Sequence, residues 1–186
     1  MKRIIISALM VLAIQGAFSQ TTHFGIKGGV NFANVRDDAA DKNADNKIGF
    51  NLGALAHIHV SRHFAVQPEI VYSTQGAKYS DDKLKLNYIN IPVLAQYMFG
   101  DGFRLQTGPQ LGILTSSSYK AGSTEIDVNN LNNVDLSWSF GGGYIGHRGL
   151  GIDVRYNLGL TDITKSNTTD LLNRVWQIGL FYQFTH

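Results

Sequence analysis

The chain has 186 residues, with 20 glycines, no cysteine, 44% hydrophobic residues and a formal net charge of +2. This length indicates a single domain. The absence of cysteine excludes disulfides and thiolate metal sites.

The N-terminal segment has the three parts of an export signal. The letters MKR supply a positive start, IIISALMVLAIQGA an apolar core, and AFS a small-residue cleavage site. We expect cleavage after Ser19, which divides the chain into a signal peptide, 1–19, and a mature domain, 20–186. A membrane anchor is the alternative, but the apolar run is short for a transmembrane helix and no stop-transfer flank follows it.

Removing this segment also removes the excess positive charge of the chain. Lys2 and Arg3 are two of the 16 basic residues, and the remaining basic residues balance the 14 acidic ones. No basic stripe is left in the mature domain, so the sequence does not predict a nucleic-acid partner.

The mature domain alternates apolar and polar residues and shows no long helical period, which predicts an all-β fold. We expect eight strands of about 10 residues each. They are Phe24–Phe32, Ile48–Val60, Phe64–Thr74, Leu84–Phe99, Phe103–Leu114, Leu136–Tyr144, Leu150–Leu160 and Val175–Phe184.

The connections between these strands alternate strictly between long and short. The short ones are Ser61–His63, Gly100–Gly102 and Gly146–Gly149, and the long ones are Ala33–Lys47, Gln75–Lys83, Thr115–Asp135 and Thr161–Arg174. The short turns then share one end of the sheet and the long loops share the other. This pattern is typical of an eight-stranded antiparallel up-and-down transmembrane β-barrel with short periplasmic turns and long extracellular loops.

A soluble lipocalin-like barrel is the alternative architecture, with its apolar side chains inside instead of outside. The polar face of the predicted strands distinguishes the two, because it consists mainly of glycine, amide and hydroxyl residues with few charges. A solvated surface favours Lys, Glu and Thr, whereas small residues suit the narrow interior of an eight-stranded barrel. The composition of this face favours the membrane barrel.

Aromatic residues gather at the ends of the predicted strands. With a periplasmic N-terminus, one group falls at the periplasmic rim: Phe24, Phe64, Tyr97, Phe99, Phe103, Tyr144, Tyr182 and Phe184. A second group falls nearer the outer rim: Phe32, Phe50, Tyr72, Trp138 and Trp176. Tyr and Trp prefer the lipid headgroup zone, so the two groups predict aromatic girdles on either side of an aliphatic band.

Three features depart from a regular barrel, and one is that Leu84–Phe99 is longer than a bilayer requires, so we expect it to project beyond the membrane. Pro68, Pro92 and Pro109 lie inside predicted strands, where each removes a hydrogen-bond donor, and we expect bulges or local breaks there. Leu55 and Leu94 fall on the otherwise polar face.

Five segments occur in an order that is characteristic of one family: FGIKGGVNFANV, LNYINIPVLAQYMF, RLQTGPQLGIL, IDVRYNLGLTDI and QIGLFYQF. From Phe24 to Phe184 the chain resembles the small outer-membrane β-barrel proteins of Bacteroidetes-type bacteria, often labelled porin-family or PorT-family. The resemblance implies an eight-stranded barrel in the outer membrane of a Gram-negative cell envelope, but no single biochemical activity. Such barrels usually end on an aromatic residue that the barrel assembly machinery reads, whereas here Thr185 and His186 follow Phe184.

Eight strands enclose a lumen that their own side chains fill, so we expect no open solute channel. Five charged residues are predicted to face this lumen: Lys27, Glu69, Arg104, Asp153 and Arg155. We expect Glu69 and Asp153 to bridge Arg104, Arg155 and, as a third cation, Lys27, because the arginine fork binds carboxylates through two parallel hydrogen bonds. We interpret this network as a structural plug. A narrow gated pore is the alternative, and it needs a second arrangement of the same charges.

The sequence offers no catalytic constellation. His57, His59 and Ser61 share the predicted lumenal face near the periplasmic end, far from outer-leaflet lipid, and no third metal ligand accompanies the two histidines. We therefore expect no enzymatic activity, no metal and no cofactor.

The first long loop, with Asp37, Asp38, Asp41 and Asp45, is acidic but lacks the glycine and terminal glutamate of a calcium loop. Such runs are usually solvated loops, and the functional alternative is adhesion to a surface, matrix or host molecule. The sequence thus predicts a monomer with a structural or surface-binding role. Its expected partners are outer-membrane lipids, the barrel assembly machinery and a surface ligand of the loops.

Overall fold

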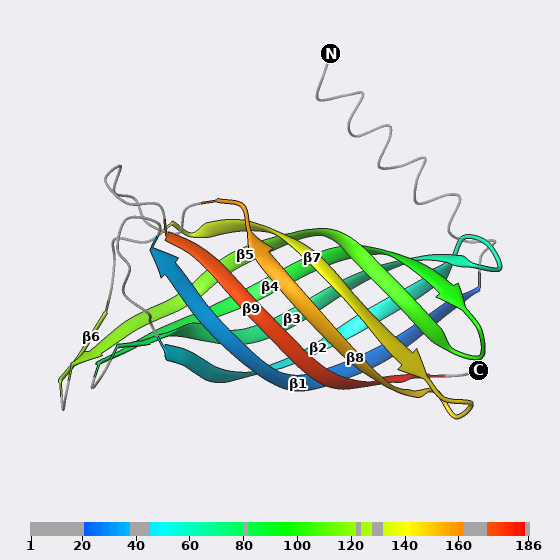
Figure 1. Ribbon diagram of the computed structural model, residues 1–186, viewed down its shortest axis with the longest axis horizontal. Coiled ribbons are helices and arrows are strands. Elements are labelled where there is room, and N and C mark those ends of the chain that lie inside the picture. Colours follow the sequence, from blue (N-terminus) through cyan, green and yellow to red (C-terminus); the bar gives the residue numbers. More distant parts are fainter. Residues whose placement is uncertain are drawn as a thin grey trace, which may run out of the picture.

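The computed structural model describes residues 21–37, 45–79, 82–121, 124–127, 132–161 and 171–184, and these form a closed β-barrel (Figure 1). The strands are β1 (Thr22–Asp37), β2 (Asp45–His59), β3 (Phe64–Tyr79), β4 (Asp82–Phe99), β5 (Phe103–Ala121), β6 (Thr124–Asp127), β7 (Val134–Ile145), β8 (Leu150–Gly159) and β9 (Leu171–Gln183). Among the described residues, no helix is long and apolar enough to cross a membrane. The expected signal peptide, 1–19, lies outside the described residues.

The eight long strands pair antiparallel around the barrel in the order β4-β3-β2-β1-β9-β8-β7-β5, and the pairing of β5 with β4 closes the ring. The first and last strands are also neighbours, with Gly25 opposite Gln183 and Asp37 opposite Leu171. Beyond this ladder, the Phe184 N–H donates to the Phe24 carbonyl oxygen at 2.7 Å. The predicted eight-stranded antiparallel barrel is therefore confirmed.

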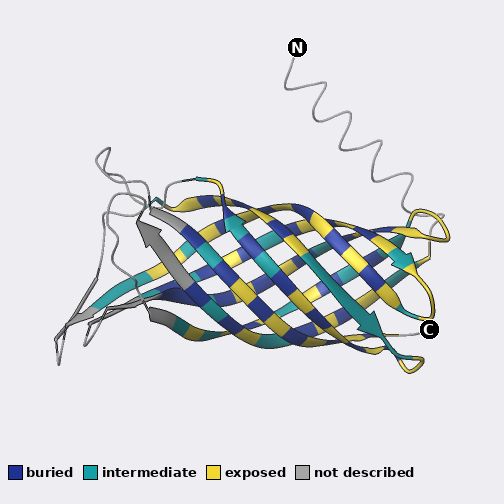
Figure 2. Ribbon diagram, viewed as in Figure 1, coloured by how far each residue is buried: buried dark blue, intermediate teal, exposed yellow. Residues whose placement is uncertain are grey.

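The alternation of the sequence places apolar side chains outside and polar ones inside (Figure 2). Leu52 is 63% exposed and Ile70 62% exposed, whereas Asn31 and Ser139 are fully buried. A soluble barrel needs the reverse, so the lipocalin-like alternative is wrong. Leu55 and Leu94 are buried in the lumen, as their register predicted.

All three predicted short turns lie at one end of the barrel, together with the start of β1 and the end of β9 (Figure 1). Gly100 and Gly102 allow the tight turn between β4 and β5, because their φ angles of 58° and 123° are ones that side chains disfavour. Gly149 does the same between β7 and β8 with a φ of 80°.

At the opposite end, all four predicted loops are wrong in extent, because β1, β2 and β9 also run into them, and two of the loops are largely strand. Most of Gln75–Lys83 continues the β3–β4 ladder, with Gln75 opposite Leu86, and much of Thr115–Asp135 belongs to β5 and β6. The apolar alternation extends only over the residues that contact lipid. Backbone pairing continues beyond them through polar residues. We call this extension, Thr74–Tyr79, Asp82–Asn87, Ser116–Ala121 and Thr124–Asp127, the projecting sheet. It extends past the start of β7 (Figure 1).

Of the bulges or local breaks expected at the prolines, the structure shows local breaks, because the strand register does not change there. The β3–β4 pairing has Pro68 opposite Val93 and resumes in the same register at Val71 opposite Asn90. Each proline on that seam interrupts the ladder without displacing it. The register shifts lie elsewhere, between Asn46 and Asn51 of β2 and at Asn87/Tyr88 of β4.

Candidate functional site

The five charged residues expected inside the barrel come from four different strands, and all are buried. Lys27 lies on β1, Glu69 on β3, Arg104 on β5, and Asp153 and Arg155 on β8. Each occupies an inward position because its two chain neighbours face outward.

Glu69 and Arg155 form a bidentate ion pair across the lumen. Arg155 Nη1 donates to Glu69 Oε2 and Nη2 to Glu69 Oε1, each at 2.9 Å. Their strands, β3 and β8, are four places apart in either direction around the eight-stranded ring. The pair therefore spans the full width of the barrel.

Lys27 and Asp153 complete a network of four charges. Lys27 Nζ lies 3.0 Å from Asp153 Oδ2 and 3.4 Å from Glu69 Oε2. Asp153 Oδ2 also lies 3.3 Å from Arg155 Nη2. Two cations and two carboxylates thus neutralise one another, which is what burial of charge requires.

Amide side chains extend this network toward the short-turn end. Gln67 Nε2 donates to Glu69 Oε1 at 2.8 Å, and Gln67 Oε1 lies 3.2 Å from His57 Nδ1. On the adjacent strands β4 and β5, Gln96 Nε2 donates to Gln106 Oε1 at 3.0 Å, and this oxygen also lies 3.4 Å from Arg155 Nη2 on β8. Polar contacts therefore cross the lumen at several heights.

Arg104 departs from the expected network. It forms no ion pair with another described residue, and its Cζ lies 5.0 Å from the centre of the Phe181 ring. Both Glu69 oxygens already accept hydrogen bonds from Arg155. The Lys27 ammonium lies beside Glu69 and Asp153 and so pairs with the carboxylates in place of Arg104. A cation can pair with a carboxylate only if both lie at the same height in the lumen. The spacing of residues along a single strand does not give this height.

The other half of the lumen holds neutral polar ladders. Asn31 Nδ2 donates to Ser73 Oγ at 2.9 Å, and Asn51 Nδ2 donates to Asn31 Oδ1 at 2.7 Å. Ser139 Oγ donates to Asn157 Oδ1 at 2.6 Å, and Asn173 Nδ2 donates to Gln75 Oε1. Most of these contacts join nearby strands along the inner wall, and the Asn173–Gln75 contact between β9 and β3 crosses the interior.

Asp135 is a lumenal residue that the sequence analysis placed in a loop. It lies in β7, is buried, and accepts a hydrogen bond from Thr161 Oγ1 at 3.0 Å. The available signal was the alternation of Asp135 with Ser137 and Ser139, which share its face.

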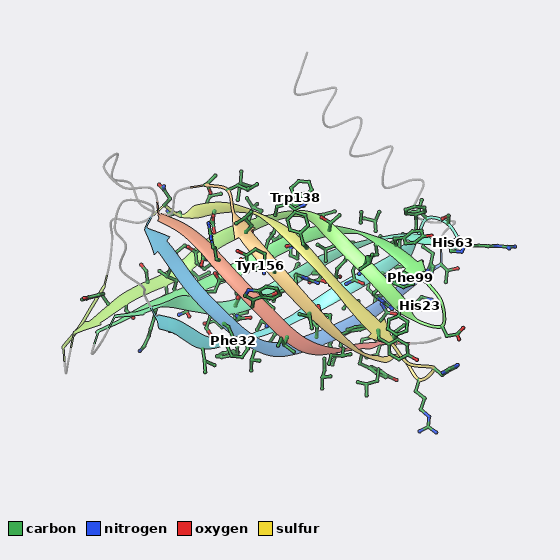
Figure 3. All side chains as sticks on the ribbon, viewed as in Figure 1. His23, Phe32, His63, Phe99, Trp138 and Tyr156 are labelled. Atoms are coloured by element: carbon green, nitrogen blue, oxygen red, sulfur yellow. The ribbon has the colours of Figure 1, made fainter. Side chains whose placement is uncertain are left out.

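The aromatic residues expected at the periplasmic rim form a chain of contacts around the short-turn end. Consecutive ring centres are 5.1 Å apart for Phe64 and Tyr97, 6.2 Å for Tyr97 and Phe99, 6.0 Å for Phe99 and Phe103, and 4.8 Å for Phe103 and Tyr144. Tyr182 near the end of β9 and Phe184 just after it form a separate pair with ring centres 5.5 Å apart. Figure 3 shows Phe99, with His23 and His63, at this end of the barrel.

The histidines expected on the lumenal face come together without forming a recognisable site. The His57 and His59 rings are 4.6 Å apart, and the His23 ring lies 5.6 Å from that of His59. Within the described ranges, no group of His, Asp and Glu has a geometry that could hold a metal ion. Ser61 is exposed, and its Oγ accepts the Phe64 N–H at 3.1 Å, which stabilises the turn.

The first long loop cannot be placed in the site, because Asp38 and Asp41 lie outside the described residues and only the backbone of Asp37 and Asp45 is described.

The structure is a closed barrel with an apolar exterior and an ion-paired interior, and its amino-acid sequence matches one protein family. Residues 18–165 match the family described as "Outer membrane protein beta-barrel domain". The chain belongs to this family. Its apolar exterior therefore faces outer-membrane lipid.

Solved outer-membrane barrels share this fold. Neisserial surface protein A matches with a TM-score of 0.63 at 15% identity, covering 87% of this chain and 97% of that one. Ail, the attachment invasion locus protein of Yersinia pestis, matches with a TM-score of 0.55 at 18% identity, covering 87% of this chain and 98% of that one. Comparison with curated protein sequences gave no match.

Proposed function

We propose that this outer-membrane barrel is a monomer with a plugged lumen, whose role is structural and surface-binding and not catalytic or channel-forming. In this proposal residues 1–19 are a cleaved signal peptide, and the barrel assembly machinery inserts the mature domain among outer-membrane lipids. The five ordered sequence segments support its placement among the porin-family or PorT-family barrels of Bacteroidetes-type bacteria. The family name does not imply an open pore.

The Glu69–Arg155 pair carries the proposal of a closed lumen. A pair that joins opposite walls must break before any solute can pass, and breaking it leaves two buried charges without partners. Lys27, Gln67 and Gln106 hold the same two groups from the sides. These contacts favour a fixed plug over a gate, since a gate needs a second arrangement of similar free energy.

Planar-bilayer recording tests the plug. We expect the wild-type barrel to be silent across the voltage range. We expect Glu69→Ala to remain silent as well, because the amide side chains still cross the lumen. Asp101→Ala, in an exposed turn, is the matched control for loss of one acid. Voltage-dependent openings in wild type, or a conductance that appears only in Glu69→Ala, would support the narrow gated pore.

The projecting sheet supports a role at the outer surface. A transmembrane strand needs about 9–11 residues, whereas β4 has 18 and β5 has 19, so both continue well beyond the bilayer. The outer edge of β6 has no partner among the described strands. Such an edge presents backbone donors and acceptors to an extended segment of another protein.

Trimming this sheet tests the surface-binding role. Residues 119–126, which include most of β6, are replaced by a two-residue Asn-Gly turn that joins Ser118 to its ladder partner Asp127. We expect bacteria displaying this variant to retain the folded barrel and to lose adhesion to plates coated with extracellular matrix. The matched control is deletion of Ala39–Asn46 in the first loop. Loss of adhesion only in that control would assign binding to the acidic loop, and unchanged adhesion in both would leave the barrel with a structural role alone.

A further inference from the structure

Arg104 is a buried cation that the charge network does not use. Its side chain is on β5, the residue is 5% exposed, and it forms no hydrogen bond or ion pair with another described side chain. Its Nε has no hydrogen-bond partner. The ring of Phe181 covers one face of the guanidinium, but this contact does not neutralise its charge.

The charges around Arg104 do not balance. At this height the lumen holds Lys27, Arg104 and Arg155 against Glu69 and Asp153, and both carboxylates are already paired with the other two cations. Asp135, also buried in the lumen, pairs in register with Gly112, eight residues along β5 from Arg104. That separation is roughly 26 Å along the strand. One positive charge therefore remains in excess beside Arg104.

A small cavity lies next to this excess charge. Arg104, Gln96, Gln106, Lys27, Asp153 and Phe181 are among its walls. The centre of a water-sized sphere can occupy about 10 Å³ of it, which is about the space that one water molecule requires. Gln106 Nε2, a second N–H donor in its wall, also lacks a partner.

We propose that this cavity binds one monatomic, monovalent anion of chloride size, held by the Arg104 guanidinium and the Gln106 amide. A water molecule would satisfy the two donors but would leave the buried positive charge uncompensated, which is costly. Polyatomic anions such as sulfate or phosphate are larger than a single halide ion and exceed the space in this cavity. The Asp153 carboxylate repels an anion, but Lys27 lies 3.0 Å from it and offsets that charge.

Bromide in place of chloride tests the site. Crystals of the detergent-solubilised full barrel are grown in sodium bromide, and anomalous scattering locates bound halide. We expect one lumenal bromide within hydrogen-bond distance of Arg104 in wild type. We expect the peak to be lost in Arg104→Gln and retained in Arg148→Gln, where the replaced arginine lies in an exposed turn. A water molecule without anomalous signal at this position in wild type, or a peak that persists in Arg104→Gln, overturns the proposal.

A solution measurement covers the case in which Arg104→Gln does not assemble. The thermal unfolding midpoint of wild type is compared in sodium chloride and in sodium gluconate at equal ionic strength, because gluconate is too large for the cavity. We expect a higher midpoint in chloride, and the same difference in Arg148→Gln. Equal midpoints of wild type in the two salts contradict the site.

Discussion

Glu69 and Arg155 lie on opposite walls of the barrel and meet at its centre through two parallel hydrogen bonds of 2.9 Å. The contact links β3 to β8, which share no backbone ladder. It therefore stabilises the barrel in a direction that strand pairing does not. The same contact is one of several that fill the lumen, together with the amide side chains of Gln67, Gln96 and Gln106, so it contributes both to the stability of the barrel and to the proposed plug.

Breaking this pair from one side destabilises the barrel. Glu69→Ala leaves the Arg155 guanidinium buried beside Lys27 without its main partner, and we expect a loss of about 3–5 kcal/mol in the free energy of unfolding. Equilibrium urea unfolding in lipid vesicles measures it. The double variant Glu69→Leu/Arg155→Met removes both charges and is expected to lose less than the single variant. A larger loss in the double variant would show that the pair itself, and not the orphaned charge, dominates.

The lipid-facing wall tolerates charge only near its rims. Ile70 is exposed on the outer face of β3 near mid-height, and we expect Ile70→Arg to cost about 2–4 kcal/mol of unfolding free energy in vesicles. Val60, at the short-turn end, is the control, because Val60→Arg is expected to cost only about 0–1 kcal/mol. Similar costs at the two positions would mean that the apolar band does not face the bilayer core.

Fluorescence quenching measures the height of the aromatic rim directly. In a background that carries Trp138→Phe and Trp176→Phe, a single tryptophan is introduced as Phe99→Trp or as Ile70→Trp. We expect lipids brominated near the headgroup to quench the tryptophan at 99 more strongly, because aromatic girdles lie at the headgroup level. Lipids brominated deep in the acyl chain are expected to quench the tryptophan at 70 more strongly. A reversed order contradicts the placement of Tyr97, Phe99 and Phe103 at the membrane surface.

Two adjacent glycines of β1 differ sharply in what a methyl group would meet. A Cβ at Gly29, on the lumenal face, would lie 2.6 Å from Gly179 Cα, whereas a Cβ at Gly28 would meet nothing closer than 3.6 Å. We expect Gly29→Ala to cost about 1–3 kcal/mol through forced strand displacement. Gly28→Ala is expected to be nearly neutral or slightly stabilising. Urea unfolding of both variants, run in parallel, makes the comparison, and equal effects would rule out close strand approach as the reason for glycine here.

The membrane-spanning part of the fold was predictable because lipid imposes a period-two pattern on each strand. Ile152, Val154 and Tyr156 mark one face, and Asp153 and Arg155 follow on the other. Apart from the excess length of Leu84–Phe99, the projecting sheet was not predictable, because lipid does not contact it and no apolar outer face is required there. The alternation of apolar residues therefore did not predict the full length of β5 or the presence of β6.

The lumenal placement of the five charged residues was predictable, but which of them pair was not. Strand parity places Lys27, Glu69, Arg104, Asp153 and Arg155 in the lumen. The pairs depend on the stagger between strands, which is set by all ladders together. For this reason Lys27 replaced Arg104 beside the carboxylates, and Arg104 came to lie against Phe181.

The ladder between β1 and β9 sets the order of events in biogenesis. The first strand to leave the ribosome obtains one of its two partners only from the last strand, up to the hydrogen bond between Phe184 and Phe24. Until the C-terminus is delivered, the β1 edge exposes a row of backbone donors and acceptors that can pair with other chains. The ring consequently cannot close until β1 and β9 are both present, so closure depends on contacts between strands that are far apart in the sequence.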